Sequence, residues 1–290
     1  MPGREISFPR RPLVMGIVNV NDDSFSGDGT LDVKASLARA RLQAEAGADV
    51  VDVGAESART NRRAVPVGEE LRRFGEFFRR WPEALDGAGP VDGEQVWPPV
   101  LSANTWRPEV VRALLAEPFG IELLNDMGGL PDDRNARLCA EHGVSLLLMH
   151  SAGEPKVARL DQRWDDVLAA IERFFEEKLA MAEAAGVERG RIVLDPGIDF
   201  AKQRPDNLAV LREFQRFLRF DRPVLAPISR KTVVGETLGL AEPADRDAGT
   251  IACLAAVLRR GAHIVRVHNV EAAWQSVAVL AGIGACERII

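Results

Sequence analysis

The sequence has few cysteines, no long apolar run and no excess of basic residues, and each absence excludes a class of protein. Its three cysteines, Cys139, Cys253 and Cys286, lie far apart, so they fit neither a disulfide framework nor a zinc site. We expect buried thiols in a reducing cytosol. No uninterrupted apolar run reaches the ~18 residues of a membrane span. The N-terminal segment MPGREISFPRRP also lacks the apolar core of a signal peptide. The sequence therefore predicts a soluble, cytoplasmic protein without a membrane partner.

The charge balance argues against a nucleic-acid partner. The chain carries 37 basic and 43 acidic residues, a net charge of −6, and the basic residues are spread over helical segments. Several catalytic patterns are missing as well: there is no HExxH zinc motif, no Ser-His-Asp arrangement and no carboxylate pair with obvious glycosidase spacing. The function must therefore come from another pattern.

That pattern is a repeated unit of apolar strand, polar tip and helix. The apolar run of Leu13 to Val18 ends at Asn19, and a loop of Asn, Asp and Ser follows it. The same plan recurs along the chain. The spacing predicts strands at residues 13–19, 49–54, 100–103, 121–124, 144–149, 191–194, 223–228 and 263–267. Helical patterns occupy residues 31–47, 67–81, 108–116, 132–142, 164–185, 205–220, 244–260 and 271–282.

Eight such units predict a (β/α)8 barrel. Continuously apolar strands are typical of a parallel sheet that is covered on both faces, and eight units in about 250 residues are typical of a TIM barrel. An open doubly wound sheet is the alternative, but no glycine-rich dinucleotide loop follows the first strand. We therefore expect one domain over residues 1–290. The Pro- and Gly-rich segment 82–99 precedes a strand, so we expect a surface insertion on the face away from the chemistry.

Active sites of such barrels use residues at the carboxyl ends of the strands. In this sequence those ends are polar and only partly charged. They hold Asn19, residues 52–56, Asn104, Asn125, Asp195, Lys231, Arg266 and His268. Carboxylate and carboxamide groups are suited to a flat heterocycle with amide and amine edges. The tip of the fifth strand is His150, for which the sequence alone favours neither a functional nor a structural role.

The last two strands add positive charge to these ends. Ser229, Arg230 and Lys231 follow the seventh strand, and Arg266 and His268 alternate on the eighth, so these two face the same side. Phosphate sites in barrels are often built by the loops after strands seven and eight. The residues therefore predict a polar heterocycle beside a phosphate or a pyrophosphate.

Six segments carry a resemblance to a known family. In chain order they are GIVNVNDDSFSGDG, DVVDVGAESART, LLNDMGGL, LDPGIDFAK, ISRKTVVG and GAHIVRVHNV. Together they resemble the dihydropteroate synthases from about residue 13 to about residue 275. The resemblance implies a (β/α)8 barrel that joins a pterin pyrophosphate to 4-aminobenzoate with Mg²⁺ and releases pyrophosphate. It also implies a homodimer formed through late helices.

The resemblance assigns roles residue by residue. Asn19 would hold the metal and the pyrophosphate, and Arg266 and His268 would bind the diphosphate, with Ser229 at the same strand ends. Arg59 and the loop after Asn19 would cover the aminobenzoate. The residues implied for the pterin pocket are Asn104, Asn125, Met149, Asp195, Phe200 and Lys231.

The sequence departs from the family pattern at three places. Asn21 and Asp22 stand where the family has Thr-Pro, and Ala58, Thr60 and Asn61 interrupt its Ser-Thr-Arg-Pro-Gly pattern. Asn104 replaces the usual aspartate, so a neutral carboxamide stands in place of a carboxylate. These departures leave two alternatives to the synthase open. One is a pterin-binding paralogue without synthase activity, and the other is a methyltetrahydrofolate-dependent methyltransferase domain.

Overall fold

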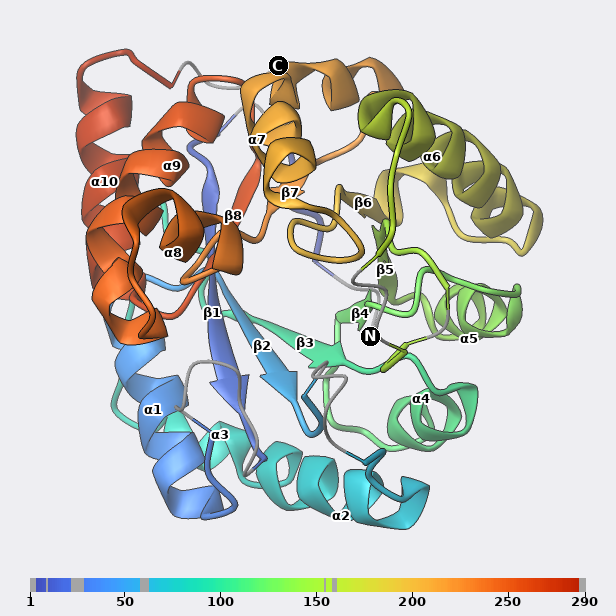
Figure 1. Cartoon of the computed structure of the whole chain (residues 1–290). Helices are drawn as coiled ribbons and strands as arrows, with labels where there is room; N and C mark the ends of the chain where they lie inside the picture. Colours follow the sequence, from blue (N-terminus) through green and yellow to red (C-terminus); the bar gives the residue numbers. More distant parts are fainter. Residues whose placement is uncertain are drawn as a thin grey trace.

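The chain forms a closed barrel of parallel strands. The structure is a computed structural model that describes residues 4–8, 10–21, 29–57, 63–153, 155–157 and 161–286. Eight strands in these ranges lie in the order β6-β5-β4-β3-β2-β1-β8-β7. A parallel bridge between Leu194 and Val224 joins the two ends of the sheet. The predicted (β/α)8 barrel is therefore confirmed, with its helices outside the strands (Figure 1).

Strands and helices alternate along the chain. The strands are β1 (Leu13–Asn19), β2 (Val50–Gly54), β3 (Val100–Asn104), β4 (Leu123–Asp126), β5 (Ser145–Met149), β6 (Ile192–Asp195), β7 (Leu225–Ala226) and β8 (Ile264–Val267). The α-helices are α1 (Val33–Glu45), α2 (Val67–Phe78), α3 (Trp81–Ala84), α4 (Pro108–Leu115), α5 (Arg134–His142), α6 (Val167–Ala184), α7 (Arg204–Arg212), α8 (Thr232–Leu238), α9 (Asp247–Leu258) and α10 (Val270–Gly282). Short 3-10 helices are η1 (Arg189–Arg191), η2 (Phe214–Phe220) and η3 (Pro243–Arg246).

Helices α7 and α8 differ from the sequence prediction. The helix expected over residues 205–220 is α7 followed by η2, with a break at Glu213. Helix α8 was not expected, because it is only seven residues long and contains Gly235. A Cβ at Gly235 would lie 2.4 Å from Nε of Arg246, so the glycine makes room for that guanidinium. The helix depends on close packing of Gly235 against Arg246, which lies eleven residues further along the chain. A local sequence pattern does not show such a contact.

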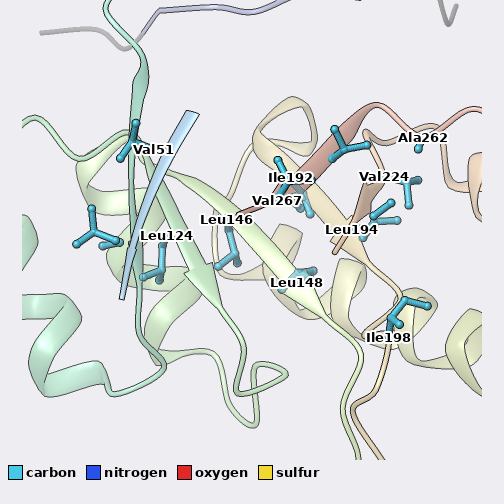
Figure 2. Close-up of a cluster of buried hydrophobic side chains, with 14 of the residues drawn as sticks. Val51, Leu124, Leu146, Leu148, Ile192, Leu194, Ile198, Val224, Ala262 and Val267 are labelled. Atoms are coloured by element: carbon cyan, nitrogen blue, oxygen red, sulfur yellow. The ribbon is translucent and has the colours of Figure 1, made fainter. Parts of the chain in front are cut away.

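Side chains on each strand alternate between the barrel interior and the shell of helices. The outward side chains of β2, β5 and β6 are apolar and join the main core, as does Leu124 of β4 (Figure 2). A second apolar cluster fills the interior. It contains Leu13, Met15, Val50, Val100, Leu123, Leu147, Leu225 and Ile264, among others. Towards the carboxyl ends of the strands the inward-facing residues become polar. The polar groups that could bind a ligand therefore lie at that end of the barrel.

The segment 82–99 is hydrogen-bonded to the barrel at the amino ends of its strands. Gln95 and Val96 are buried. The Gln95 side chain donates to the carbonyl oxygen of Ala48 at 2.9 Å, and the Val96 amide donates to the Asp49 carboxylate at 2.9 Å. The sequence predicted a surface excursion on this side. The structure adds that the end of the segment next to β3 is part of the packed barrel.

Replacing Gln95 with Ala is expected to lower the free energy of unfolding by about 2 kcal/mol, because it takes from the buried carbonyl oxygen of Ala48 the donor that it has in the structure. The matched control is Gln215→Ala, since Gln215 is exposed and its amide donates to Glu213, two residues away. Urea unfolding of both variants measures the difference. Equal stabilities would show that the segment contributes nothing to the barrel.

Candidate active site

The carboxylate of Asp52 joins the ends of four strands. It is fully buried on β2 and accepts a hydrogen bond from Ser102 Oγ at 2.6 Å. Its Oδ2 accepts from Nδ2 of Asn104 at 3.2 Å and from Nδ2 of Asn125 at 3.0 Å. Arg266 completes the group, with Nε and a terminal nitrogen both 2.8 Å from the same oxygen. One carboxylate thus orients three residues that the sequence predicted for the site.

The Asp52 carboxylate also fixes the orientation of Asn104. Ionised Asp52 only accepts hydrogen bonds, so Nδ2 of Asn104 faces it and Oδ1 faces away. Among the described residues this buried Oδ1 has no hydrogen-bond partner. A Cβ built on Gly54 would lie 3.8 Å both from Cβ of Asn104 and from Oδ1 of Asn19. Asn19 and Asn104 therefore flank the same glycine, at the ends of β1 and β3.

Asp195 ends β6 and is buried beside positive charge. Its Oδ1 accepts the amide of Gly197 at 2.7 Å. Burial raises the pKa of Asp195 from 3.8 to about 6, although the Gly197 amide, Lys231, Lys202 and Arg266 each act to lower it. Gly197 has a φ of +67°, and a Cβ there would lie 1.9 Å from a backbone oxygen, so no other residue fits this turn. The turn keeps the carboxylate at the end of the barrel.

Lys231 lies against the loop that follows β6. Its Nζ donates to the carbonyl oxygen of Ile198 at 2.9 Å and sits 4.6 Å from the centre of the Phe200 ring. Met149 belongs to the interior apolar cluster, and Phe200 packs against it. The structure therefore brings Lys231, Phe200 and Met149 to one side of the barrel mouth. Burial lowers the pKa of Lys231, and the charges of Asp199 and Asp195 oppose that shift.

His268 is held by Ser229. The Ser229 hydroxyl lies 2.8 Å from Nδ1 of His268 and accepts the His268 amide at 3.0 Å. The contact with Ser229 therefore sets the orientation of the His268 ring. His268 lies just after β8, whose last residue is Val267, so that Arg266 and His268 face one side stays a prediction.

Lys202 is a buried cation that the sequence prediction did not include. Its Nζ lies 2.8 Å from Nδ1 of His150 and donates to the carbonyl oxygens of Gly197 at 2.9 Å and Phe200 at 3.2 Å. Burial lowers the pKa of Lys202 to about 7 and that of His150 to about 2. His150 also packs against the rings of Trp164 and Phe174. This pair supports the loop after β6, so the contacts of His150 in the described part of the chain are structural.

Glu56 ties together the loops after three strands. Arg107, after β3, lies 2.5 Å from the Glu56 carboxylate, and Lys156, after β5, lies 2.9 Å from it. Nζ of Lys156 also donates to the carbonyl oxygen of Ser57 at 3.1 Å. Arg107 pairs with buried Glu70 of α2 as well. The sequence prediction included Glu56 among the strand ends but neither Arg107 nor Lys156. Their pairing depends on contacts between loops that are distant in the chain.

Several predicted positions lie outside the described residues. Arg59, which the resemblance places over the aminobenzoate, is one of them. The departures Asp22, Ala58, Thr60 and Asn61 are others. Asn21 is described and is fully buried beyond the end of β1.

The described residues supply three further findings about the site and the chain. They contain no cluster of three or more His, Cys, Asp or Glu side chains that could hold a metal ion. Cys139 and Cys286 are buried, Cys253 is half-buried, and all three thiols are free. No helix in the described ranges is long and apolar enough to cross a membrane.

A parallel barrel with carboxylate, carboxamide and cationic groups gathered at its carboxyl ends defines a small-molecule enzyme of the TIM-barrel class. The comparisons give its family. The sequence profile of the pterin binding enzymes matches residues 15–268. The dihydropteroate synthase of Escherichia coli (strain K12) is 34% identical over 270 residues, which cover 93% of this chain and 90% of the relative.

Two solved structures are similar in fold and in sequence. The dihydropteroate synthase of Xanthomonas albilineans with 4-aminobenzoic acid has a TM-score of 0.82 and is 36% identical, with 96% of this chain and 94% of that chain covered. The same enzyme in complex with 7,8-dihydropteroate has a TM-score of 0.79 and 35% identity, with 96% and 95% covered. The chain therefore belongs to the pterin-binding enzymes, and within them to the dihydropteroate synthase family, whose members are transferases of folate biosynthesis.

Proposed function

We propose that the chain condenses 6-hydroxymethyl-dihydropterin pyrophosphate with 4-aminobenzoate and releases pyrophosphate. The observation that carries this proposal is the Asp52 group, because it places ring-binding carboxamides beside a guanidinium. In the reaction the aryl amine nitrogen attacks the pterin methylene carbon. A C–N bond forms, the C–O bond to the diphosphate breaks, and the amine loses a proton. The comparisons favour this reaction over a methyltransferase, because the relatives reported above are synthases.

The pterin ring would lie between Asn104, Asn125 and Asp195. Oδ1 of Asn104 has no described partner and is available to an N–H of the ring. The carboxylate of Asp195 accepts hydrogen bonds from the amine edge, and Lys231 donates to a ring acceptor. Phe200 and Met149 would cover the apolar faces. The neutral Asn104 thus retains the acceptor that an aspartate would offer, but without its charge.

The diphosphate would lie at the end of β8. Negative charge grows on this leaving group as the C–O bond breaks, and fixed cations stabilise such charge best when they need no rearrangement. Arg266 is fixed by Asp52, and His268 is fixed by Ser229. Both side chains would therefore bind the diphosphate from prearranged positions. The resemblance adds Arg59 and the loop after Asn19 for the aminobenzoate, which positions the amine for attack.

Mg²⁺ would be held by Asn19 together with the diphosphate. Mg²⁺ keeps several waters and is often bound by one or two protein oxygens and substrate phosphates. The carboxamide oxygen of Asn19 lies at the end of β1 beside the Asp52 group, so it fits this mode. A preformed cluster of acidic ligands is not required there, in agreement with its absence among the described residues. When bound, the ion supplies further positive charge at the leaving group.

Incubating the protein with the pterin pyrophosphate, 4-aminobenzoate and Mg²⁺ is expected to give dihydropteroate and pyrophosphate in equal amounts. Omitting the aminobenzoate should abolish dihydropteroate formation. Chromatography measures the product, and an enzymatic assay measures the pyrophosphate. Intact binding of the pterin without any turnover would refute the synthase and favour the paralogue.

The homodimer remains a prediction of the resemblance. Exposed apolar side chains on the late helices agree with it, since Leu238 is 51% and Val279 is 62% exposed. Light scattering of the purified protein tests it. The reducing cytosol suggested by the dispersed cysteines is likewise a prediction, in agreement with three free thiols.

A further inference from the structure

We propose that Asp199 is a positioning residue for Lys231: its carboxylate holds the helix that begins after Lys231, while its two neighbours hold the lysine side chain. The inference rests on the proposed function, since Lys231 is expected to bind the pterin.

Asp199 supplies the N-terminal cap of α8 from another loop. Lys231 is the N-cap residue of this helix, but lysine has no acceptor and caps nothing. One carboxylate oxygen of Asp199 accepts the amide of Thr232, and the other accepts the amide of Val233 at 3.3 Å. Two backbone donors that the first helical turn leaves unpaired are thereby satisfied. A carboxylate at a helix N-terminus also interacts favourably with the helix dipole.

Asp199 is itself held in an unusual conformation. Its φ is +64°, a region that aspartate enters more readily than most residues do. Asn207 of α7 fixes it there with a reciprocal pair of hydrogen bonds. The Asp199 amide donates to Oδ1 of Asn207 at 2.8 Å, and Nδ2 of Asn207 donates to the Asp199 carboxylate at 3.0 Å. Since Asn207 is buried, Asp199 is a fixed support for α8.

The residues on either side of Asp199 hold the side chain of Lys231. Ile198 accepts the Nζ hydrogen bond at 2.9 Å, and the Phe200 ring lies 4.6 Å from Nζ. Three consecutive residues after β6 thus fix both the backbone and the ammonium group of Lys231. A change at Asp199 should therefore move the cation without touching the substrate pocket directly.

Asp199 also acts on the charge of Lys231. The charged groups that face this lysine are Asp195 on β6, Asp199 and Lys202 in the following loop, and Arg266 on β8. The two acids favour the protonated lysine, whereas burial and the two cations oppose it. Removing the Asp199 charge should lower the pKa at which Lys231 loses its proton.

The test is the pH profile of kcat/KM for the pterin pyrophosphate in Asp199→Asn. The alkaline limb is expected to move down by about one pH unit, because one nearby opposite charge is removed. KM for the pterin pyrophosphate is expected to rise about tenfold at the pH of the wild-type optimum. Asp199→Gly, which suits the positive φ but also lacks the carboxylate, is expected to show the same shift. It serves as the second variant if Asp199→Asn folds poorly.

The matched control is Asp221→Asn. Asp221 also has a positive φ, +52°, but it is exposed at the end of η2 and is expected to leave the profile unchanged. An active wild type with an unmoved alkaline limb in both Asp199 variants would overturn this inference. An inactive wild type would instead overturn the proposed function.

Discussion

Replacing Arg266 with Met is expected to lower kcat/KM for the pterin pyrophosphate by about a thousandfold. The variant loses a fixed cation at the leaving diphosphate. Among the described residues it also leaves the buried Asp52 carboxylate with neutral donors alone, Ser102, Asn104 and Asn125, so the orientation of the two carboxamides is no longer secured. Steady-state kinetics under saturating 4-aminobenzoate measures the loss. A fall of less than tenfold would contradict the role of Arg266.

A double variant separates the two effects of Arg266→Met. Breaking a buried ion pair from one side costs about 3–5 kcal/mol of stability, because the partner charge is left uncompensated. Adding Asp52→Asn removes that charge, so we expect the double variant to recover stability but not activity. Arg216→Met is the matched control, since Arg216 pairs with Glu172 at 2.9 Å away from the strand ends. Its kcat/KM is expected to stay within twofold of the wild type.

Replacing Asp195 with Asn is expected to lower kcat/KM about a hundredfold while making the protein more stable at pH 7. Asn offers one acceptor oxygen and a donor in place of two acceptors, so it cannot bind the amine edge of the pterin as a carboxylate does. The loss should lie in KM for the pterin pyrophosphate as well as in kcat. Activity and stability would then change in opposite directions, which a variant that merely disturbs the fold cannot do.

The pH dependence of Asp195 follows from its raised pKa. The folded value is about 6 and the ordinary value is 3.8, so between these values the folded protein binds more protons than the unfolded chain. The free energy of unfolding therefore falls as the pH rises through this window, and Asp195→Asn should regain about 3 kcal/mol above pH 6. Wild-type kcat/KM should show an acid limb near pH 6, because the ionised carboxylate is the binding form. The variant should lack that limb.

Asp126→Asn is the control for Asp195→Asn. Burial raises the pKa of Asp126 to about 6 as well, but this side chain points away from the barrel interior and bonds Asn135 at 2.8 Å. The kcat/KM of this variant is expected to stay within twofold of the wild type, with its acid limb in place. A comparable loss of activity in both variants would show that burial of a carboxylate, and not its position, explains the effect.

The sequence predicted the barrel because each of its strands has a local apolar pattern that can be recognised in the sequence. The run from Leu13 to Asn19 gives β1 with the bounds that the structure has. The two-residue alternation also separates Asn125, which faces Asp52, from Asp126, which faces the helices. Of the predicted strand ends, Asn104, Asn125 and Arg266 are neighbours around Asp52 in the structure.

What the sequence did not predict are the bonds between loops that are distant in the chain. Lys202 lies next to His150, and Asp199 caps α8, only because β5, β6 and β7 are neighbours in the closed barrel. The orientation of Asn104 likewise depends on Asp52, which lies on the adjacent strand. From the sequence alone, Asn104 differed from the usual aspartate of the family only by the loss of a negative charge. In the structure it is a neutral acceptor that adds no second carboxylate beside Asp52.

A crystal structure of the protein with the pterin pyrophosphate bound tests the account most directly. We expect the ring between Asn104, Asn125 and Asp195, with Oδ1 of Asn104 accepting a hydrogen bond from it, and the diphosphate on Arg266 and His268. A pterin ring that makes no contact with Asn104, or a diphosphate away from the end of β8, would contradict the site as described.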